Sequence, residues 1–179
     1  MNKHKDDHRI AQESMTEALF QLMSQKPFSE ITITELVEKA GVARATYYRN
    51  YSSKEDIIKQ FIYDCQSAFW RQYPCAQLSD LIAPERTRAL FKFVEDYQEL
   101  LIVLNKNGLA SLYLDYRNQF MLERFENISG HPLSETDRLH IFAFVGAEFN
   151  IVFNCLISGQ ASREDVAKEI HHLYESVLK

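Results

Sequence analysis

The chain has 179 residues, of which 46% are hydrophobic and 25% charged, as in ordinary soluble globular proteins. Its net charge of −5 at pH 7 looks unsuited to a DNA-binding protein, but the charge is unevenly distributed. Residues 1–60 carry nine Lys/Arg against nine Asp/Glu, whereas residues 61–179 carry eleven against sixteen. The acidic part of the chain is therefore not expected to contact nucleic acid.

Glycine and proline are scarce, at five and four residues, and no alternating pattern of strand length occurs, so we predict an all-α protein. The three cysteines lack CxxC spacing and suit free thiols in a reducing cytoplasm. The first twenty residues are charged throughout, unlike a signal peptide. No apolar run is expected to approach the length of a bilayer span. These features predict a cytoplasmic protein without a membrane segment.

The first helix is expected from about residue 7 to residue 25, where apolar side chains recur at helical spacing. Residues 32–54 then predict a helix-turn-helix. Thr32-x-x-Glu35 is a capping box, in which the two side chains bond to the first N–H groups of a helix. Gly41 follows that helix at a position that favours positive φ. A second short helix is predicted from Ala43 to Tyr51. The second helix of a helix-turn-helix can enter the major groove of DNA.

This second helix displays an unusual set of side chains. From Ala43 to Lys54 there are three basic residues, three tyrosines and no acid. Hydroxyls and guanidiniums without carboxylates suit a polyanion, because phosphate contacts supply affinity and base-edge contacts supply specificity. The alternative is a solvated basic helix in an ordinary helical bundle.

The run G-V-A-R-A-T-Y-Y-R-N-Y-S-S-K-E-D-I resembles the recognition element of the TetR/AcrR family of bacterial transcriptional regulators. That family shows Gly-Val-x-x-x-Thr-(aromatic)-Tyr-x-x-(aromatic)-x-x-Lys-(acid) after a Thr-capped helix. The resemblance covers roughly residues 8–62. It implies a helix-turn-helix DNA-binding domain at residues 1–52 and a regulatory and dimerisation domain at residues 53–179.

Periodicity and the resemblance together assign roles within the helix-turn-helix. Tyr47 and Tyr51 lie four residues apart and are expected to pack inward with Val42. The resemblance implies contacts to base edges, where an arginine can bind guanine and methyl groups can meet thymine. These contacts are expected from Arg44, Ala45, Thr46 and Arg49. Phosphate contacts, for which helix N-termini are also suited, are expected from Thr32, Thr34, Tyr48 and Lys54.

One long helix is predicted from residue 53 to residue 73, followed by a loop to residue 84 with at most one helical turn. The resemblance implies that this helix joins head and body, and that a ligand tilting it changes the spacing of two heads in a dimer. Further helices are predicted at residues 85–95, 97–104, 109–125, 134–158 and 162–179. The total is about nine helices.

The helix from Leu139 to Ile157 is apolar nearly all round and must be covered on more than one side. A second subunit is the simplest cover, and a twofold dimer suits a palindromic operator. The alternative is a central core helix in a monomer. Interface residues are expected on this helix and on the last one: Ala143, Gly146, Ala147, Asn150, Phe153, Val166, Ile170, Leu173 and Val177.

Aromatic residues of the body are expected to line a modest ligand pocket, because buried tyrosines and tryptophan need polar partners. Plain core packing is the alternative for each of them. The residues are Phe69, Trp70, Phe91, Tyr97, Tyr113, Tyr116, Phe120 and Phe144.

No glycine-rich phosphate loop, nucleophile elbow, metal-spaced residue set or carboxylate pair occurs, so we expect no enzyme, no cofactor and no metal. The resemblance implies a ligand-responsive repressor that binds a palindromic operator in double-stranded DNA as a homodimer, with a small-molecule effector of unknown identity. Two alternatives keep the same head. One is an activator or a regulator controlled by a protein partner, and the other is an architectural or cell-division factor that binds many chromosomal sites.

Overall fold

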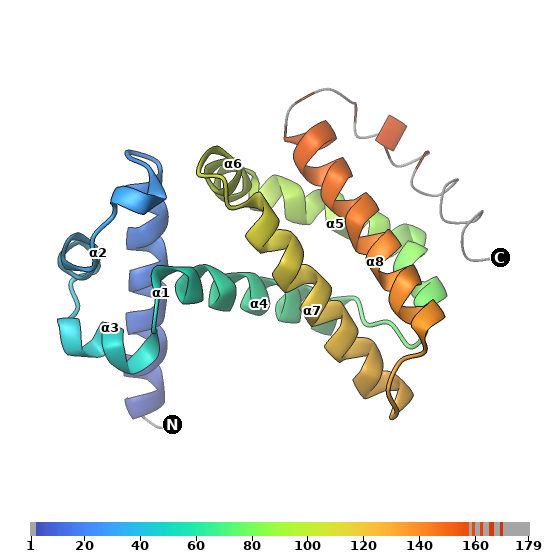
Figure 1. Cartoon of the computed structure of the whole chain (residues 1–179), viewed down its shortest axis with the longest axis horizontal. Coiled ribbons are helices and arrows are strands. Elements are labelled where there is room, and N and C mark those ends of the chain that lie inside the picture. The colour runs from blue at the N-terminus through green and yellow to red at the C-terminus, as the bar shows by residue number, and fades with distance from the viewer. Residues whose placement is uncertain (1–2, 158, 160–161, 163–164, 167–168, 170–179) are drawn as a thin grey trace. The chain divides into compact units, whose positions relative to one another are not determined.

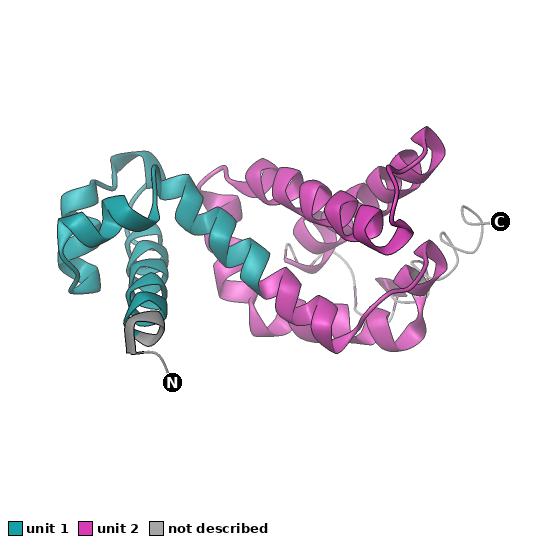
Figure 2. Cartoon of the chain, turned by 90° about the horizontal axis from the view of Figure 1, so that it is seen from below, with its two compact units in different colours: residues 1–64 teal, residues 65–179 magenta. Residues whose placement is uncertain are grey.

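The structure, a computed structural model, describes residues 3–157, 159, 162, 165–166 and 169. Figure 2 shows the two compact units of the chain, Met1–Asp64 and Cys65–Lys179, here called the head and the body. The division falls inside one continuous helix, α4 (Lys54–Gln72). The described residues form eight α-helices and no strand, which confirms the predicted all-α class.

The head is built from three helices and the beginning of a fourth (Figure 1). Helix α1 (Lys3–Met23) packs against both α2 (Ile33–Ala40) and α3 (Arg44–Asn50), and a 3-10 turn, η1 (Phe28–Glu30), joins α1 to α2. Burial of apolar side chains from all four helices stabilises this arrangement. The most deeply buried of them are Met15, Leu19, Leu36, Tyr47, Ile57 and Ile58.

The local signals read from the sequence explain the turn between α2 and α3. Thr32 Oγ1 accepts a hydrogen bond from the Glu35 N–H at 3.2 Å, and Glu35 Oε2 accepts one from the Thr32 N–H at 2.9 Å, so both bonds of the capping box form. Hydrogen bonds from Lys26 and Thr32 lower the pKa of Glu35 to about 2. Gly41 ends α2 with φ of 66°, which side chains rarely allow.

The body contains η2 (Leu78–Ile82), α5 (Pro84–Asp96), α6 (Gln98–Lys106), α7 (Ala110–Ser129) and α8 (Glu135–Asn150). Helix α8 continues as a π-helical segment, η3 (Ile151–Leu156), and packs side by side with α7 (Figure 1). One core cluster joins the loop after α4, η2, α7 and α8. Its buried members are Cys75, Leu81, Phe120, Met121, Phe125, Ile141 and Val145. Most of the helix predicted at residues 162–179 lies outside the described residues.

Helix α8 and η3 contradict the expectation that no apolar run approaches the length of a bilayer span. Together they form a stretch of 22 residues, Glu135–Leu156, whose most apolar 18 residues have a mean hydropathy of 1.6. This stretch is long and apolar enough to cross a membrane by length and composition alone. The core helix of a soluble protein meets the same criteria. Glu148 in this stretch is buried and bonded to Arg117 of α7, as expected for a helix that packs within a protein.

Candidate nucleic-acid interface and body pocket

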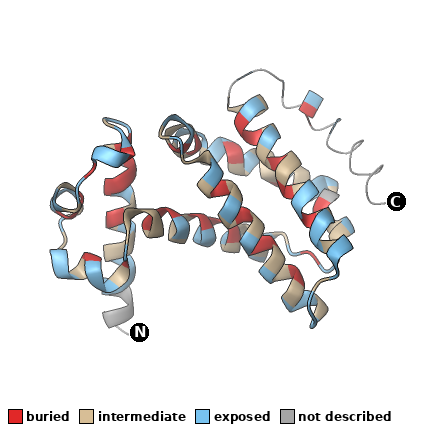
Figure 3. Ribbon diagram, viewed as in Figure 1, coloured by how far each residue is buried: buried red, intermediate tan, exposed pale blue. Residues whose placement is uncertain are grey.

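Most residues of helix α3 are exposed (Figure 3). Arg44, Tyr48 and Arg49 are exposed, Tyr48 to 57%, whereas Tyr47 is only 1% exposed and anchors the helix in the core of the head. Its neighbour Tyr51 is also buried, as the spacing of four residues predicted. The exposed face of α3 therefore carries the basic and hydroxyl groups, and the buried face carries the two inward tyrosines.

The two arginines of α3 are each held by a neighbour one turn away. Arg44 Nη2 lies 3.3 Å from the Tyr48 hydroxyl oxygen, and its guanidinium carbon lies 5.7 Å from the centre of the Tyr48 ring. Arg49 Nη2 donates to Thr46 Oγ1 at 3.1 Å. Ala45 is exposed between them, and Thr46 is half-buried. These contacts restrict the arginines before any ligand binds, which reduces the entropy lost on binding.

The N-terminus of α2 lies in the same unit. Thr32 and Thr34 are exposed there, next to N–H groups that suit an anion because of the helix dipole. The Thr32 hydroxyl already serves the capping box, since it donates to Glu35 Oε2 at 2.8 Å and accepts from the Glu35 N–H. A phosphate at this end of α2 is therefore expected to bond to backbone N–H groups and to Thr34 rather than to the Thr32 hydroxyl.

Lys54 has a role that its sequence position did not reveal. Its Nζ donates to the backbone oxygens of Phe28 at 2.7 Å and of Ile31 at 2.6 Å, and lies 4.5 Å from the centre of the Phe28 ring. Burial lowers the pKa of Lys54. An ammonium group has three N–H donors, so one remains for the phosphate contact that the resemblance implies. These two hydrogen bonds connect the first turn of α4 to η1 and to Ile31, which follows it.

Replacing Lys54 by methionine is expected to lower the unfolding free energy by about 1.5–3 kcal/mol, because two charge-assisted hydrogen bonds to partly buried carbonyls are lost. Urea denaturation followed by circular dichroism measures this change. Lys59→Met removes an exposed charge from the same helix and is expected to change stability by less than about 0.5 kcal/mol. Equal losses for the two variants would show that the bonds of Lys54 contribute little.

The body contains two small adjoining pockets, here together called the pocket of the body, which share Phe69, Leu90, Arg117 and Glu148. Three of the eight predicted aromatic residues line it: Phe69, Tyr113 and Phe144. The other five lie elsewhere. Trp70 and Phe120 pack in the core cluster, where the centre of the Trp70 ring lies 5.6 Å from that of Phe125. Phe91, Tyr97 and Tyr116 are half-buried outside the pocket lining.

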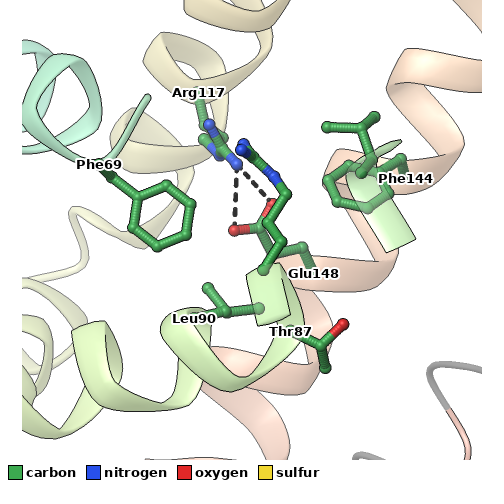
Figure 4. A pocket seen from close by; sticks show the side chains of 8 residues that line it. Phe69, Thr87, Leu90, Arg117, Phe144 and Glu148 are labelled. Carbon is green, nitrogen blue, oxygen red and sulfur yellow. Dashed lines mark hydrogen bonds and ion pairs between the residues drawn. The ribbon is translucent and has the colours of Figure 1, made fainter. Parts of the chain in front are cut away.

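Charged side chains of the pocket were not identified from the sequence. Arg117 Nη2 donates to both carboxylate oxygens of Glu148, at 2.8 and 3.2 Å, and both side chains are only 8% exposed. Burial lowers the pKa of Arg117, but the charge of Glu148, its hydrogen bonds with Arg117 and the nearby Tyr113 together outweigh burial and raise that pKa. Figure 4 shows Phe69 and Phe144 on opposite sides of this ion pair, with Leu90 and Thr87 completing the wall.

Arg86 of α5 is the second buried cation of the pocket, at 5% exposed. It follows Pro84, which opens the helix, and the sequence offers no signal that it points inward. The only acidic residue in the middle of the apolar stretch, Glu148, was the one hint of a buried charge. No group of three or more His, Cys, Asp or Glu residues suited to a metal ion occurs in the described part of the chain.

The predicted interface residues divide into two groups. Ala143 and Asn150 are exposed on α8, and Gly146 is half-buried beside them. Phe153 instead lies in the core of its own chain, 3% exposed, with its ring 5.3 Å from that of Tyr113. Two further predicted residues also pack within the chain, since Val166 is buried against a cluster that includes Ala147. Ile170, Leu173 and Val177 lie outside the described residues.

Comparison with known proteins links the head to a family. The sequence model of the family described as bacterial regulatory proteins, tetR family, matches residues 16–61. An uncharacterized HTH-type transcriptional regulator of Bacillus subtilis (strain 168), YxbF, is 26% identical over 102 residues. The matched part is 55% of this chain but only 24% of that protein, so the chain spans about a quarter of the relative's length.

Solved structures share the fold of most of the chain. A tetR-family transcriptional regulator from Streptomyces coelicolor aligns with a TM-score of 0.58 and 13% identity, over 93% of this chain and 79% of that one. A TetR transcriptional regulator from Rhodococcus sp. RHA1 aligns with a TM-score of 0.54 and 20% identity, over 95% of this chain and 96% of that one. At these identities the likeness shows the fold alone.

Proposed function

Because this chain belongs to the tetR family of bacterial regulatory proteins, whose helix-turn-helix binds DNA, we propose that it is a transcriptional repressor of the cytoplasm that occupies a palindromic operator as a homodimer. The observation that carries this proposal is the outer face of α3, where Arg44, Tyr48 and Arg49 are exposed and no acid occurs. Such a face attracts phosphate and can bond to base edges. Proteins of this kind are regulators and not enzymes.

Selection of bound fragments from random double-stranded DNA, with the purified protein at physiological salt, tests the proposal. We expect one palindrome with half-sites about one helical turn apart, or a multiple of that distance. Transcription in vitro from a promoter that carries the palindrome should fall when the protein is added. A rise identifies an activator, and recovery of many unrelated sequences identifies an architectural factor. No enrichment above background would contradict sequence-specific binding by this protein.

We propose that the homodimer forms through a stripe on α8 consisting of Leu139, Phe142, Ala143, Gly146 and Asn150. These residues follow the helical spacing of one face. Leu139 is 61% and Phe142 41% exposed, which is unusual for large apolar side chains. The small residues beside them allow close approach of a second helix. Burial of each large side chain contributes about 1.5–3 kcal/mol, and a twofold axis uses the stripe twice.

Phe142→Glu is expected to convert the dimer to a monomer, because it places a charge in the centre of the buried stripe. Light scattering after size-exclusion chromatography gives the mass at several protomer concentrations. Ile128→Glu is the matched control, since Ile128 is 42% exposed on α7 and lies outside the stripe. The interface is misplaced if both variants remain dimers or both dissociate.

A regulator controlled by a protein partner is the second candidate function, and the same stripe favours it. If Phe142→Glu leaves the dimer intact, the stripe is free for another protein. Phe142→Glu is therefore expected to be a monomer if the stripe forms the homodimer, and to remain a dimer if the stripe binds a protein partner.

We also propose that the repressor leaves DNA when a small molecule binds the pocket of the body. Gln66 and Phe69 line this pocket and belong to α4, which runs without interruption from Lys54 of the head. A ligand that binds better to one position of α4 than to another shifts the equilibrium between them. Loss of operator binding on addition of an effector, in a gel-shift titration, tests this step.

A further inference from the structure

The pocket of the body contains a buried cation with an unused donor. Arg86 is 5% exposed, and one of its terminal nitrogens, Nη1, donates to the backbone oxygen of Tyr73. The other, Nη2, is buried and has no hydrogen-bond partner among the described residues. The guanidinium carbon lies 5.0 Å from the centre of the Phe69 ring and 5.1 Å from that of Trp70. Aromatic faces compensate a cation only in part, so an unpaired donor here is costly.

The charges around this cation do not balance. Two guanidiniums, those of Arg86 and Arg117, line the pocket together with one carboxylate, that of Glu148. The carboxylate is occupied by two hydrogen bonds from Arg117. Asp80 lies outside the lining, and its carboxylate accepts two backbone N–H groups at 2.7 and 3.1 Å. Burial raises the pKa of the nearby Cys75 thiol, which keeps it neutral at pH 7. Within the described part of the chain, one positive charge therefore remains without a bonded anion.

The rest of the pocket suits a molecule with a polar end and an apolar body. Gln66 is 5% exposed, and neither its amide nitrogen nor its amide oxygen has a hydrogen-bond partner in the part of the chain that the structure describes. Phe69, Leu90, Phe93 and Phe144 supply apolar walls. Binding sites for small molecules commonly combine apolar walls with a few polar groups that fix orientation. Arg86 and Gln66 are the polar groups of this pocket that are left without such bonds.

We propose that the effector is a small organic carboxylate that bonds to Arg86 Nη2, with its apolar part against Phe69, Leu90 and Phe144 and a second polar contact to Gln66. This inference rests on the proposed release from DNA by an effector and names the chemical class of that effector. Without a ligand the pocket is too small for such a molecule, so a compact acid enters only as side chains of the wall move apart.

The closed state of the pocket gives the carboxylate a way to act on the chain. Without a ligand the pocket has room for only one or two water molecules. An organic acid must therefore displace side chains as it binds. Gln66 and Phe69 are among them, and both project from α4. Binding that widens the pocket consequently favours a different position of α4, as a regulatory ligand must.

The test compares carboxylic acids with their neutral amides on the intact protein. The panel contains acetate, octanoate, benzoate and phenylacetate, each paired with its amide of nearly equal shape. Trp70 is the only tryptophan and lies beside Arg86, so its fluorescence reports binding, and calorimetry provides a second measurement. We expect at least one apolar acid to bind at least about tenfold more tightly than its amide, because the amide leaves the guanidinium unpaired.

Arg86→Met is expected to remove this preference, so that acid and amide bind alike. The control is Arg88→Met, which replaces an exposed arginine two residues away on α5. This variant should keep the preference for the acid. Arg86→Lys retains the charge without the planar fork and should keep a weakened preference. If Arg86→Met does not fold, the proposal is tested by comparing the affinities for acid and amide of the unchanged protein and of Arg86→Lys. Equal binding of every acid and its amide, or a preference that survives Arg86→Met, overturns the proposal.

Gel-shift titration with the selected operator separates this inference from the proposed function. Release of DNA by the bound acid, lost in Arg86→Met, supports both. Acid binding at Arg86 without release supports an anion site and overturns its regulatory use. Absence of operator binding by the unliganded protein overturns the proposed repressor, whereas the acid and amide comparison is unaffected because it contains no DNA.

Discussion

Arg44→Ala is expected to cost about 1–3 kcal/mol of operator affinity for each half-site, and roughly twice that for the dimer. Arg44 opens α3 on its exposed face, and its guanidinium is already restrained by Tyr48. An arginine in that position can form two hydrogen bonds to guanine that no other base offers. Binding to random DNA should change little, because only one charge is removed. Fluorescence anisotropy with the selected palindrome and a scrambled duplex measures both affinities.

Lys39→Ala is the matched control for that experiment. Lys39 is exposed in the last turn of α2, at the opposite end from the threonines expected to approach phosphate. The substitution Lys39→Ala removes one positive charge from the head, as Arg44→Ala does. It should lower the affinity for both duplexes slightly and by the same factor. If Arg44→Ala also weakens the palindrome and the scrambled duplex equally, Arg44 contacts phosphate and the base-reading role must pass to Arg49.

The sequence was sufficient to predict those features of the structure that depend on contacts between residues close together in the chain. The capping box of Thr32 and Glu35, the positive φ of Gly41 and the inward side of Tyr47 depend on residues within about four positions of one another. The Ser134 cap of α8 is a further example, with Ser134 Oγ accepting from the Asp137 N–H at 3.1 Å. Such contacts form within a single helix or turn, so residue spacing alone specifies them.

Contacts between helices were not predictable in this way. Lys54 binds carbonyls 23 and 26 positions earlier, and Arg117 pairs with Glu148, 31 positions later. Periodicity identifies which residues share a helical face, but not which other helix that face meets. Phe153 illustrates the limit: it belongs to an apolar helix expected at the interface, yet packs against Tyr113 inside its own chain. The unpaired donor of Arg86 is likewise visible only once α4, α5 and α8 are brought together.

The buried ion pair between α7 and α8 carries the largest expected effect on stability. Glu148→Leu leaves Arg117 buried and unpaired, with Arg86 as a second cation in the same pocket and no carboxylate among the described residues that line it. We expect the unfolding free energy to fall by about 3–5 kcal/mol. Urea denaturation at a fixed protomer concentration measures it, since dimerisation makes stability depend on concentration. The double variant Arg117→Met with Glu148→Leu should regain most of the loss, because it removes the stranded guanidinium of Arg117 together with the carboxylate.

An exposed pair between the same two helices provides the control. Arg138 of α8 lies 3.6 Å from Glu126 of α7, and the two side chains are 45% and 42% exposed. Water screens that pair, so Glu126→Leu is expected to cost less than about 1 kcal/mol. If Glu148→Leu costs no more than Glu126→Leu, the pocket admits enough water to solvate Arg117. Arg86 would then be solvated by the same water, and its unused donor would no longer require an anion.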